Sequence, residues 1–280
     1  MFSDKYGYKK QKAIQHENVS DELRNRIWNL FYQSEIKDGG LSSKRLGLAL
    51  NGGQTIEEKI VDRFGLLINC KDKSQSVEER LKERVVKLFY WYEMYDFIEI
   101  HLSYLEDEER NIRIKQYNEI LEQEKAGYRI VSGEIAPITN IEEIKAIEQS
   151  ADTEFLSVNQ HIKKALNLYA DIQEPDYENS IKESISAVEA MCCIITGLSG
   201  ANATLGKAIK KLKDNGVHIH SAMEQAFLSL YGYTSDEDGI RHGGIDFKNA
   251  PAEDAKYMLV SCSAFVNYLI EKYEKLQIGK

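Results

Sequence analysis

The sequence predicts a mainly α-helical protein made of two domains. Three observations support this: apolar residues recur at helical spacing over most of the 280 residues, only three prolines interrupt the chain, and strand-like spacing is confined to one short stretch. Apolar residues make up 42% and charged residues 29%, which is the composition of folded domains. A chain of this length can form two domains, each with its own core.

The first half of the chain shows helical spacing in successive segments. We expect helices at residues 21–33 and 55–70, where apolar residues recur every three or four positions after a capping side chain. Residues 76–105 keep the pattern throughout, which predicts one long, mostly buried helix. Its aromatic residues could stack nucleic-acid bases, but helical spacing favours core packing; they are Phe89, Tyr90, Trp91, Tyr92 and Tyr95. A further helix is expected at 108–127.

The spacing becomes strand-like at residues 127–139. Alternating apolar positions flank the pair Ser132 and Gly133, which predicts a small β-hairpin. Because helical spacing resumes immediately afterwards with a new charge pattern, we place the domain boundary here. The predicted domains are 1–139, helical with the hairpin, and 140–280, a helical bundle.

The second half is helical again from residue 140, and we expect a bundle of four or five helices after residue 153. In the segment 176–198, Glu189 lies at the edge of an apolar helix face, which places it to reach a cleft. The final helix, 254–275, is apolar over a wide arc. This arc predicts homodimerisation through the C-terminal bundle.

Charge and composition exclude several classes of protein. The formal net charge of −9 disfavours a protein that coats DNA, although a local basic groove could bind RNA. The N-terminus carries charges where a secretion signal needs an apolar run, and the longest apolar run, 257–270, is shorter than the ~20 residues that cross a bilayer. The four cysteines lack a CxxC spacing and read as buried thiols. We expect a cytoplasmic protein, no membrane association and no cofactor.

One segment, TSDEDGIRHGG at residues 234–244, gathers acids, an arginine, a histidine and glycines between two helices. Histidine titrates near neutrality and arginine binds phosphate through two parallel hydrogen bonds, so His242 and Arg241 suit RNA cleavage without metal. The glycines would let the chain bend so that both side chains face one substrate. Alternatively, Arg241 pairs with neighbouring acids such as Asp238, and His242 caps a helix end.

Further candidate residues lie elsewhere in the second half. Glu189 could orient His242 or contact ribose, or it could be a solvated or ion-paired group. Three lysines on one face of a predicted helix could follow an RNA backbone, although such faces also occur simply as solvated surface. The RNA-binding candidates are Lys207, Lys210, Lys211 and Asp238. His218 and His220 have no third ligand nearby in the sequence, so we predict no metal site.

Six sequence blocks, in order, resemble bacterial proteins that join a type-four AbiJ N-terminal domain to a HEPN-like helical domain. The blocks are FSDKYGYK, DELRNRIWN, GYRIVSGEIAPITN, PDYENSIKESISAVEA, HSAMEQAFLSLYGYTSDEDGIRHGG and MLVSCSAFVNYLI. The resemblance implies an abortive-infection role and a bundle that dimerises. It also implies a metal-independent endoribonuclease whose arginine is followed, after four to six residues, by a histidine. Here Asp246, Phe247 and Lys248 hold the histidine positions, and His242 follows Arg241 directly. This leaves open a rearranged catalytic pair or a bundle without catalysis.

These features predict an antiphage abortive-infection protein that cuts RNA with its C-terminal domain, while the N-terminal domain acts as a sensor or restrains that activity. The alternative is a HEPN-like dimer that binds RNA, a nucleotide or a partner protein without catalysis. The expected partners are RNA, a second copy of the chain, and a phage-derived trigger or regulatory protein.

Overall fold

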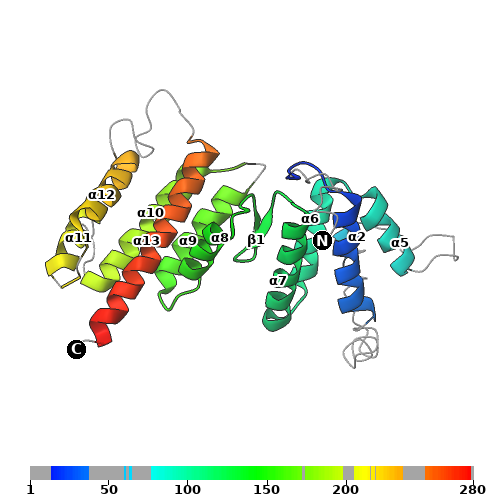
Figure 1. The fold of residues 1–280 in the computed structure, drawn as a ribbon, viewed down its shortest axis with the longest axis horizontal. Helices are drawn as coiled ribbons and strands as arrows, with labels where there is room; N and C mark the ends of the chain where they lie inside the picture. The colour runs from blue at the N-terminus through cyan, green and yellow to red at the C-terminus, as the bar shows by residue number, and fades with distance from the viewer. Residues whose placement is uncertain are drawn as a thin grey trace, which may run out of the picture. The chain divides into compact units, whose positions relative to one another are not determined.

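The computed structural model shows a mainly α-helical protein with one small β-hairpin, which confirms the predicted fold class (Figure 1). The described residues are 14–37, 60, 63–64, 77–171, 174–197, 205–214, 216–217, 219–235 and 250–278. The chain divides into two compact units, Met1–Thr139 and Asn140–Lys280.

The first unit begins with α2, Asp21–Phe31, which continues into a π-helical turn, η1, Tyr32–Lys37. The hydroxyl oxygen of Ser20 accepts a hydrogen bond from the backbone N–H of Leu23 at 3.3 Å and caps the helix. The apolar face of α2 is buried in the core of the unit, so the helix expected here is confirmed. The helix expected at 55–70 lies almost entirely outside the described residues.

The segment expected to form one long helix is broken. It contains α5, Val77–Glu83, a π-helical turn η3, Arg84–Leu88, and α6, Trp91–Ser103. At the break, Phe89 has an extended backbone with φ −61° and ψ 136°. The Glu93 carboxylate accepts a hydrogen bond from the N–H of Tyr90 at 2.6 Å, which caps the new helix. The prediction of one continuous helix was therefore wrong.

The break also divides the aromatic cluster of this segment. Phe89 and Tyr95 are buried, and the ring centroid of Phe89 lies 4.6 Å from that of Phe64. Tyr90 and Tyr92, in contrast, are 66% and 49% exposed. Because Tyr90 is the cap of α6 and not an interior helical residue, its ring does not follow the apolar face. The expectation of core packing was wrong for these two tyrosines.

The first unit ends with α7, Asp107–Gln123, and an antiparallel hairpin of β1, Arg129–Val131, and β2, Glu134–Ala136. The two residues of the turn, Ser132 and Gly133, both have positive φ, at 49° and 95°. Positive φ at both positions matches the strand twist in a two-residue hairpin. The predicted hairpin is therefore confirmed, and its turn residues explain it.

The second unit is a bundle of helices (Figure 1). They are α8, Ile141–Ala151, α9, Leu156–Ala170, α10, Tyr177–Thr196, α11, Leu205–Asp214, α12, Ser221–Ser235, and α13, Ala252–Ile278. The helix α10 is central, because it packs against α9, α11, α12 and α13. Asp176 caps its start by accepting a hydrogen bond from the N–H of Asn179 at 3.0 Å, and Gly197 ends it with a φ of 68°.

The wide apolar arc of α13 is covered inside the chain. Ile270 of this arc is partly exposed, and its other five side chains are at most 2% exposed; they are Met258, Leu259, Cys262, Phe265 and Leu269. They are buried because α13 packs against α8, α9 and α10. Most of the arc is therefore covered without a second chain, so the arc by itself does not require a homodimer. Dimerisation stays a prediction that rests on the family resemblance.

No helix in the described ranges is both long enough and apolar enough to span a bilayer. Among the cysteines, Cys192 and Cys262 are buried, as expected, whereas Cys193 is only half-buried and Cys70 lies outside the described residues. Burial raises the pKa of the Cys192 and Cys262 thiols to about 12. These two thiols are therefore protonated at neutral pH and poorly nucleophilic.

Candidate functional site

The segment with the predicted catalytic pair connects α12, which ends at Ser235, to α13, which begins at Ala252. Arg241, His242 and Asp238 themselves lie outside the described residues. Their assignment as catalytic and RNA-binding groups stays a prediction.

Glu189 lies on α10 at the edge of the buried face, as its spacing predicts. Ile185 and Val188 beside it are buried, whereas Glu189 is half-buried. Burial and then the charge of Glu189 raise the pKa of the Cys193 thiol, one turn further along the helix. The carboxylate thus affects its surroundings, but its predicted role toward His242 stays a prediction.

Ile209 of α11 is buried against the bundle, and Lys207 and Lys211 lie on the opposite side of the helix. Lys207 and Lys210 are exposed, and Lys211 is partly exposed. A surface with several amines can follow a phosphate backbone. Contact of this face with RNA stays a prediction.

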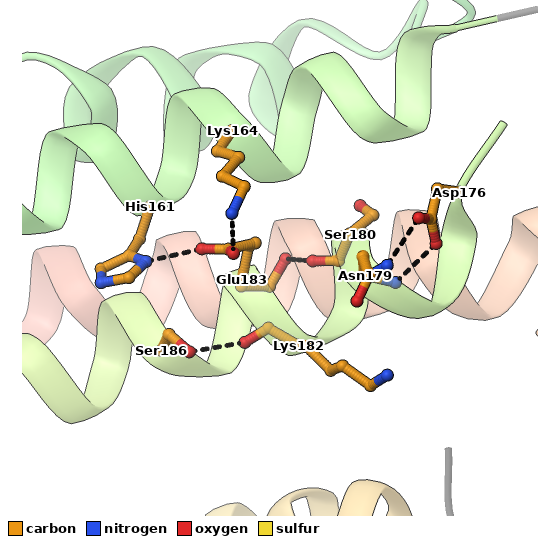
Figure 2. Close-up of polar contacts among 9 residues, drawn as sticks. His161, Lys164, Asp176, Asn179, Ser180, Lys182, Glu183 and Ser186 are labelled. Atoms are coloured by element: carbon orange, nitrogen blue, oxygen red, sulfur yellow. Dashed lines mark hydrogen bonds and ion pairs between the residues drawn. The ribbon is translucent and has the colours of Figure 1, made fainter. Parts of the chain in front are cut away.

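The structure adds a polar cluster that the sequence did not suggest (Figure 2). His161 and Lys164 extend from α9 toward Glu183 on α10. The Nδ1 atom of His161 lies 2.6 Å from Oε2 of Glu183, and Nζ of Lys164 lies 2.5 Å from Oε1. One carboxylate therefore binds a histidine and a lysine with its two oxygens. We call these three residues the Glu183 cluster.

The packing of α9 against α10 determines the geometry of this cluster. The buried hydroxyl of Ser180 donates a hydrogen bond to the backbone carbonyl of Ala165 at 2.8 Å and joins the two helices. Glu183 follows Ser180 by three residues, and Lys164 and His161 precede Ala165 by one and four. Because the two helices are antiparallel, moving forward along α10 from Ser180 and backward along α9 from Ala165 leads in the same direction. The helix contact at Ser180 thus brings all three charged groups together.

The charges of the Glu183 cluster favour an ionised carboxylate. The Glu183 side chain is 16% exposed, and desolvation by burial opposes its ionisation. Hydrogen bonds from Lys164 and His161, together with their charges, outweigh that effect and lower the pKa of Glu183. An ionised carboxylate can only accept, so Nδ1 of His161 is the donor.

This arrangement leaves the second ring nitrogen of His161 available for proton transfer. In the neutral form of the ring, Nδ1 carries the proton that Glu183 accepts, and Nε2 keeps its lone pair. The His161 side chain is 37% exposed, so a solute can approach it. A carboxylate that holds an imidazole in one tautomer is the arrangement of a general base. Within the described ranges, no three His, Cys, Asp or Glu side chains are grouped as metal ligands.

Sequence reasoning missed the Glu183 cluster because nothing local marks it. His161 and Glu183 are separated by 22 positions, on different helices. The pairing of His161 and Lys164 at i, i+3 would place both on one helix face, but such pairs are common on solvated surfaces. Only the register of α9 against α10 makes Glu183 their partner.

A second histidine–glutamate pair lies in the first unit. There Nε2 of His101 lies 3.2 Å from Oε1 of Glu35, and Nδ1 lies 2.8 Å from the hydroxyl oxygen of Tyr117. His101 has no exposed surface, and the edge of its ring meets the ring of Phe31. Since no solute can reach this imidazole, the pair joins η1, α6 and α7 and is not a candidate active site.

Comparison with known proteins gives one family. The family model described as AbiJ N-terminal domain 4 matches residues 1–153, which is more than half of the chain. No curated protein and no solved structure matches the chain. The matched residues comprise the first unit and α8 of the second.

Proposed function

The chain belongs to the AbiJ N-terminal domain 4 family, and we propose that it is an abortive-infection protein that cleaves RNA with its second unit. The AbiJ-type domain indicates the defence role. The nuclease activity is supported by the resemblance of the second half to HEPN-like domains. The observation that carries it is the partly exposed His161, whose Nδ1 is held by Glu183.

RNA cleavage without metal needs three groups. A base removes the proton of the ribose 2′-OH, an acid protonates the leaving 5′-oxygen, and a cation stabilises the charge that builds on the phosphate. We assign His161 as the base, because Glu183 fixes its tautomer and stabilises the imidazolium that forms. We assign His242 as the acid and Arg241 as the phosphate-binding cation.

Two further groups support the same reaction. The lysines on the exposed side of α11 would bind the RNA backbone on either side of the scissile phosphate. Glu189, on the same helix as Glu183, would orient His242 or contact ribose. In this proposal a phage-derived trigger acts through the first unit, and RNA is the substrate of the second.

The second candidate function is binding without cleavage. The absence of the Arg-to-His spacing expected of HEPN ribonucleases favours it, because His242 follows Arg241 directly. A bundle with the α11 lysines but no competent acid–base pair would bind RNA, a nucleotide or a partner protein. In that case the homodimer implied by the resemblance is the recognition unit.

The decisive experiment incubates the purified full chain with mixed RNAs in the presence of a chelator and identifies the product ends. We expect 2′,3′-cyclic phosphate ends. Arg241→Ala and His242→Ala should each lower the rate by about 10²- to 10⁴-fold without loss of helical structure. RNA binding without cleavage would replace this proposal with the second candidate.

The control variants are chosen to match the chemistry. Lys248→Ala removes a charge from the same connection that the mechanism does not use. His220→Ala removes an exposed histidine of the same unit, whose Nδ1 lies 3.2 Å from the backbone nitrogen of Ala222 at the start of α12. Both variants should cleave RNA at the rate of the wild type. A comparable loss in either control would show that the assay reports on general damage.

A further inference from the structure

Two tyrosines project from the start of α6 without serving the core. Tyr90 and Tyr92 are 66% and 49% exposed, and their rings stack on each other with centroids 5.6 Å apart and planes 10° apart. Leu88, two residues earlier, is 56% exposed. Three large side chains are thus exposed within five residues, at the point where the helix breaks. Exposed apolar groups concentrated in this way are typical of binding surfaces.

The ring of Tyr90 does not hold the helix break in place, whereas the ring of Tyr92 also meets that of Trp91 edge to face, with centroids 5.8 Å apart. The helix break is held by the buried ring of Phe89 and by the contact of Glu93 with the N–H of Tyr90. The latter uses only the backbone of Tyr90, so its ring is free to serve another purpose. Stacked tyrosine rings are rigid and lose little conformational freedom on binding, which is why tyrosine is common at interaction hot spots.

Acidic side chains continue this surface along α6. Tyr92, Asp96 and Glu99 are spaced at i, i+4 and i+7, so they lie on one exposed face of the helix. Burial and then the charge of Glu93 raise the pKa of Asp96. Burial, then Glu134 of β2 and Asp96, raise the pKa of Glu99. These carboxylates therefore repel one another, and a positive charge brought to this face would stabilise them.

The charges of this surface disfavour nucleic acid as its occupant. Phosphates would be repelled by Asp96, Glu99 and Glu134. The nearest lysine in the sequence, Lys87, lies 3.6 Å from the carboxylate of Glu83. The opposite charge is what the face accommodates: a guanidinium can lie over a tyrosine ring and also approach a carboxylate.

We propose that Leu88, Tyr90, Tyr92, Asp96 and Glu99 form a docking surface for a basic polypeptide segment that carries arginine next to apolar residues. We call it the α6 surface. Arginine side chains would lie against the two tyrosine rings and approach the two carboxylates, while an apolar neighbour packs on Leu88. A hollow in the same unit gives room for a further side chain; it is lined by Val19, Asp21, Arg24, Asn25, Val86 and Lys87. The proposal concerns the first unit and stands whether or not the second unit cleaves RNA.

The test measures binding of fluorescent probes to the full chain by anisotropy. The main probe is an eight-residue peptide of alternating arginine and leucine; the other probes are the same peptide with glutamate for arginine and a uridine octamer. We expect only the arginine peptide to bind. Tyr90→Ala with Tyr92→Ala should weaken it about tenfold, as expected for the loss of two cation–π contacts.

Charge variants separate the α6 surface from general attraction to an acidic protein. Asp96→Asn with Glu99→Gln should weaken the arginine peptide several-fold and reduce the salt dependence of binding. The matched control, Glu108→Gln with Glu119→Gln on α7, removes the same charge from exposed positions elsewhere in the unit. Tyr257→Ala removes an exposed tyrosine from α13. Neither control should change the affinity.

Three results would overturn the proposal. One is unchanged affinity of the arginine peptide for the Tyr90 and Tyr92 double variant. Another is an equal loss in the α7 charge control, which would mean that net charge alone attracts the peptide. The third is binding of the uridine octamer that depends on the same tyrosines, which would make the surface a base-stacking platform. Circular dichroism of each variant confirms that the helices are retained.

Discussion

Each unit contains a histidine held by a glutamate, and the two pairs differ mainly in burial. His101 has no exposed surface and contacts both Glu35 and Tyr117. His161 is 37% exposed and shares Glu183 with Lys164. In both pairs an imidazole nitrogen faces a glutamate oxygen, but only the second imidazole can meet a solute. Burial therefore separates a pair that holds helices together from a pair that can transfer protons.

The surrounding side chains support the same distinction. Tyr117 is buried beside His101, and burial raises the pKa of its phenol well above the ordinary value, so the hydroxyl stays neutral. It serves as a fixed hydrogen-bond partner. At the other pair the additional partner is the amine of Lys164, which is 63% exposed. Removing one member of a buried polar network lowers stability, because the remaining polar groups stay buried without a partner. An exposed network tolerates the same loss, because water replaces the missing partner.

The largest expected effect is on activity at the exposed pair. His161→Ala should lower RNA cleavage about 10²- to 10⁴-fold, because a general base is lost, while thermal stability changes little. Glu183→Gln should give a smaller loss with a changed pH–rate profile, since the imidazole loses its carboxylate. Cleavage rates and melting curves on the same samples measure both. Full activity of His161→Ala would remove His161 from the proposed mechanism.

The next effect concerns the division between the units. Ile144 and Ile147 of α8 are buried in the second unit, and the side-chain N–H of Asn267 donates to the carbonyl of Ala146 at 3.0 Å. A fragment 154–280 loses this helix and about 3 to 6 kcal/mol from the two isoleucines, whereas 140–280 keeps it. We expect only the longer fragment to fold, as judged by cooperative thermal unfolding. If both fold alike, α8 belongs functionally to the first unit, as the family match suggests.

At the buried pair we expect a loss of stability. His101→Ala leaves Glu35 and the Tyr117 hydroxyl without their partner, and the free energy of unfolding should fall by about 3 kcal/mol. Tyr117→Phe removes one hydrogen bond and keeps the ring, so it should cost about 1 kcal/mol. Urea denaturation measures both values. A milder effect of His101→Ala than of Tyr117→Phe would contradict a central role for the imidazole.

The pH dependence of stability should reveal the stabilisation that the ionised Glu35 and Glu183 contribute. Burial disfavours the Glu35 carboxylate, but contacts with His101, Ser34 and Arg113 outweigh this and lower its pKa, as the partners of Glu183 do. A carboxyl with a lowered pKa binds fewer protons when folded than when unfolded, so its stabilisation is present above about pH 4.5 and is lost as pH falls below that. Glu35→Gln and Glu183→Gln should each weaken the dependence of stability on pH below about pH 4.5. Urea midpoints between pH 3 and 7 test this, with Glu119→Gln as the exposed control.

The smallest effect is expected at Lys164. Its ion pair with Glu183 is exposed on the lysine side, so Lys164→Ala should change stability by less than about 1 kcal/mol. The effect should shrink further in high salt. Thermal melting at two salt concentrations measures it. A loss as large as that of His101→Ala would mean that the two pairs are equally structural.

Several elements follow from local sequence. The hairpin turn needs positive φ at two adjacent positions, which Ser132 and Gly133 supply. The start and end of α10 follow from the cap at Asp176 and the left-handed Gly197. In these places the interactions connect residues a few positions apart. The sequence by itself therefore determined the mainly helical fold, the hairpin and most helix positions.

Other features depended on contacts between distant residues. Periodicity could not reveal the break at Phe89, because the same aromatic residues fit one long helix and also two helices separated by a cap. The burial of Phe89 against Phe64 decides between these two arrangements. The cover of α13 likewise comes from three other helices. The pairing of His161 with Glu183 requires α9 and α10 to meet in the register held by Ser180 and Ala165. Only the tertiary structure decided these, because the partners of a helix face lie outside the range of i to i+4 interactions.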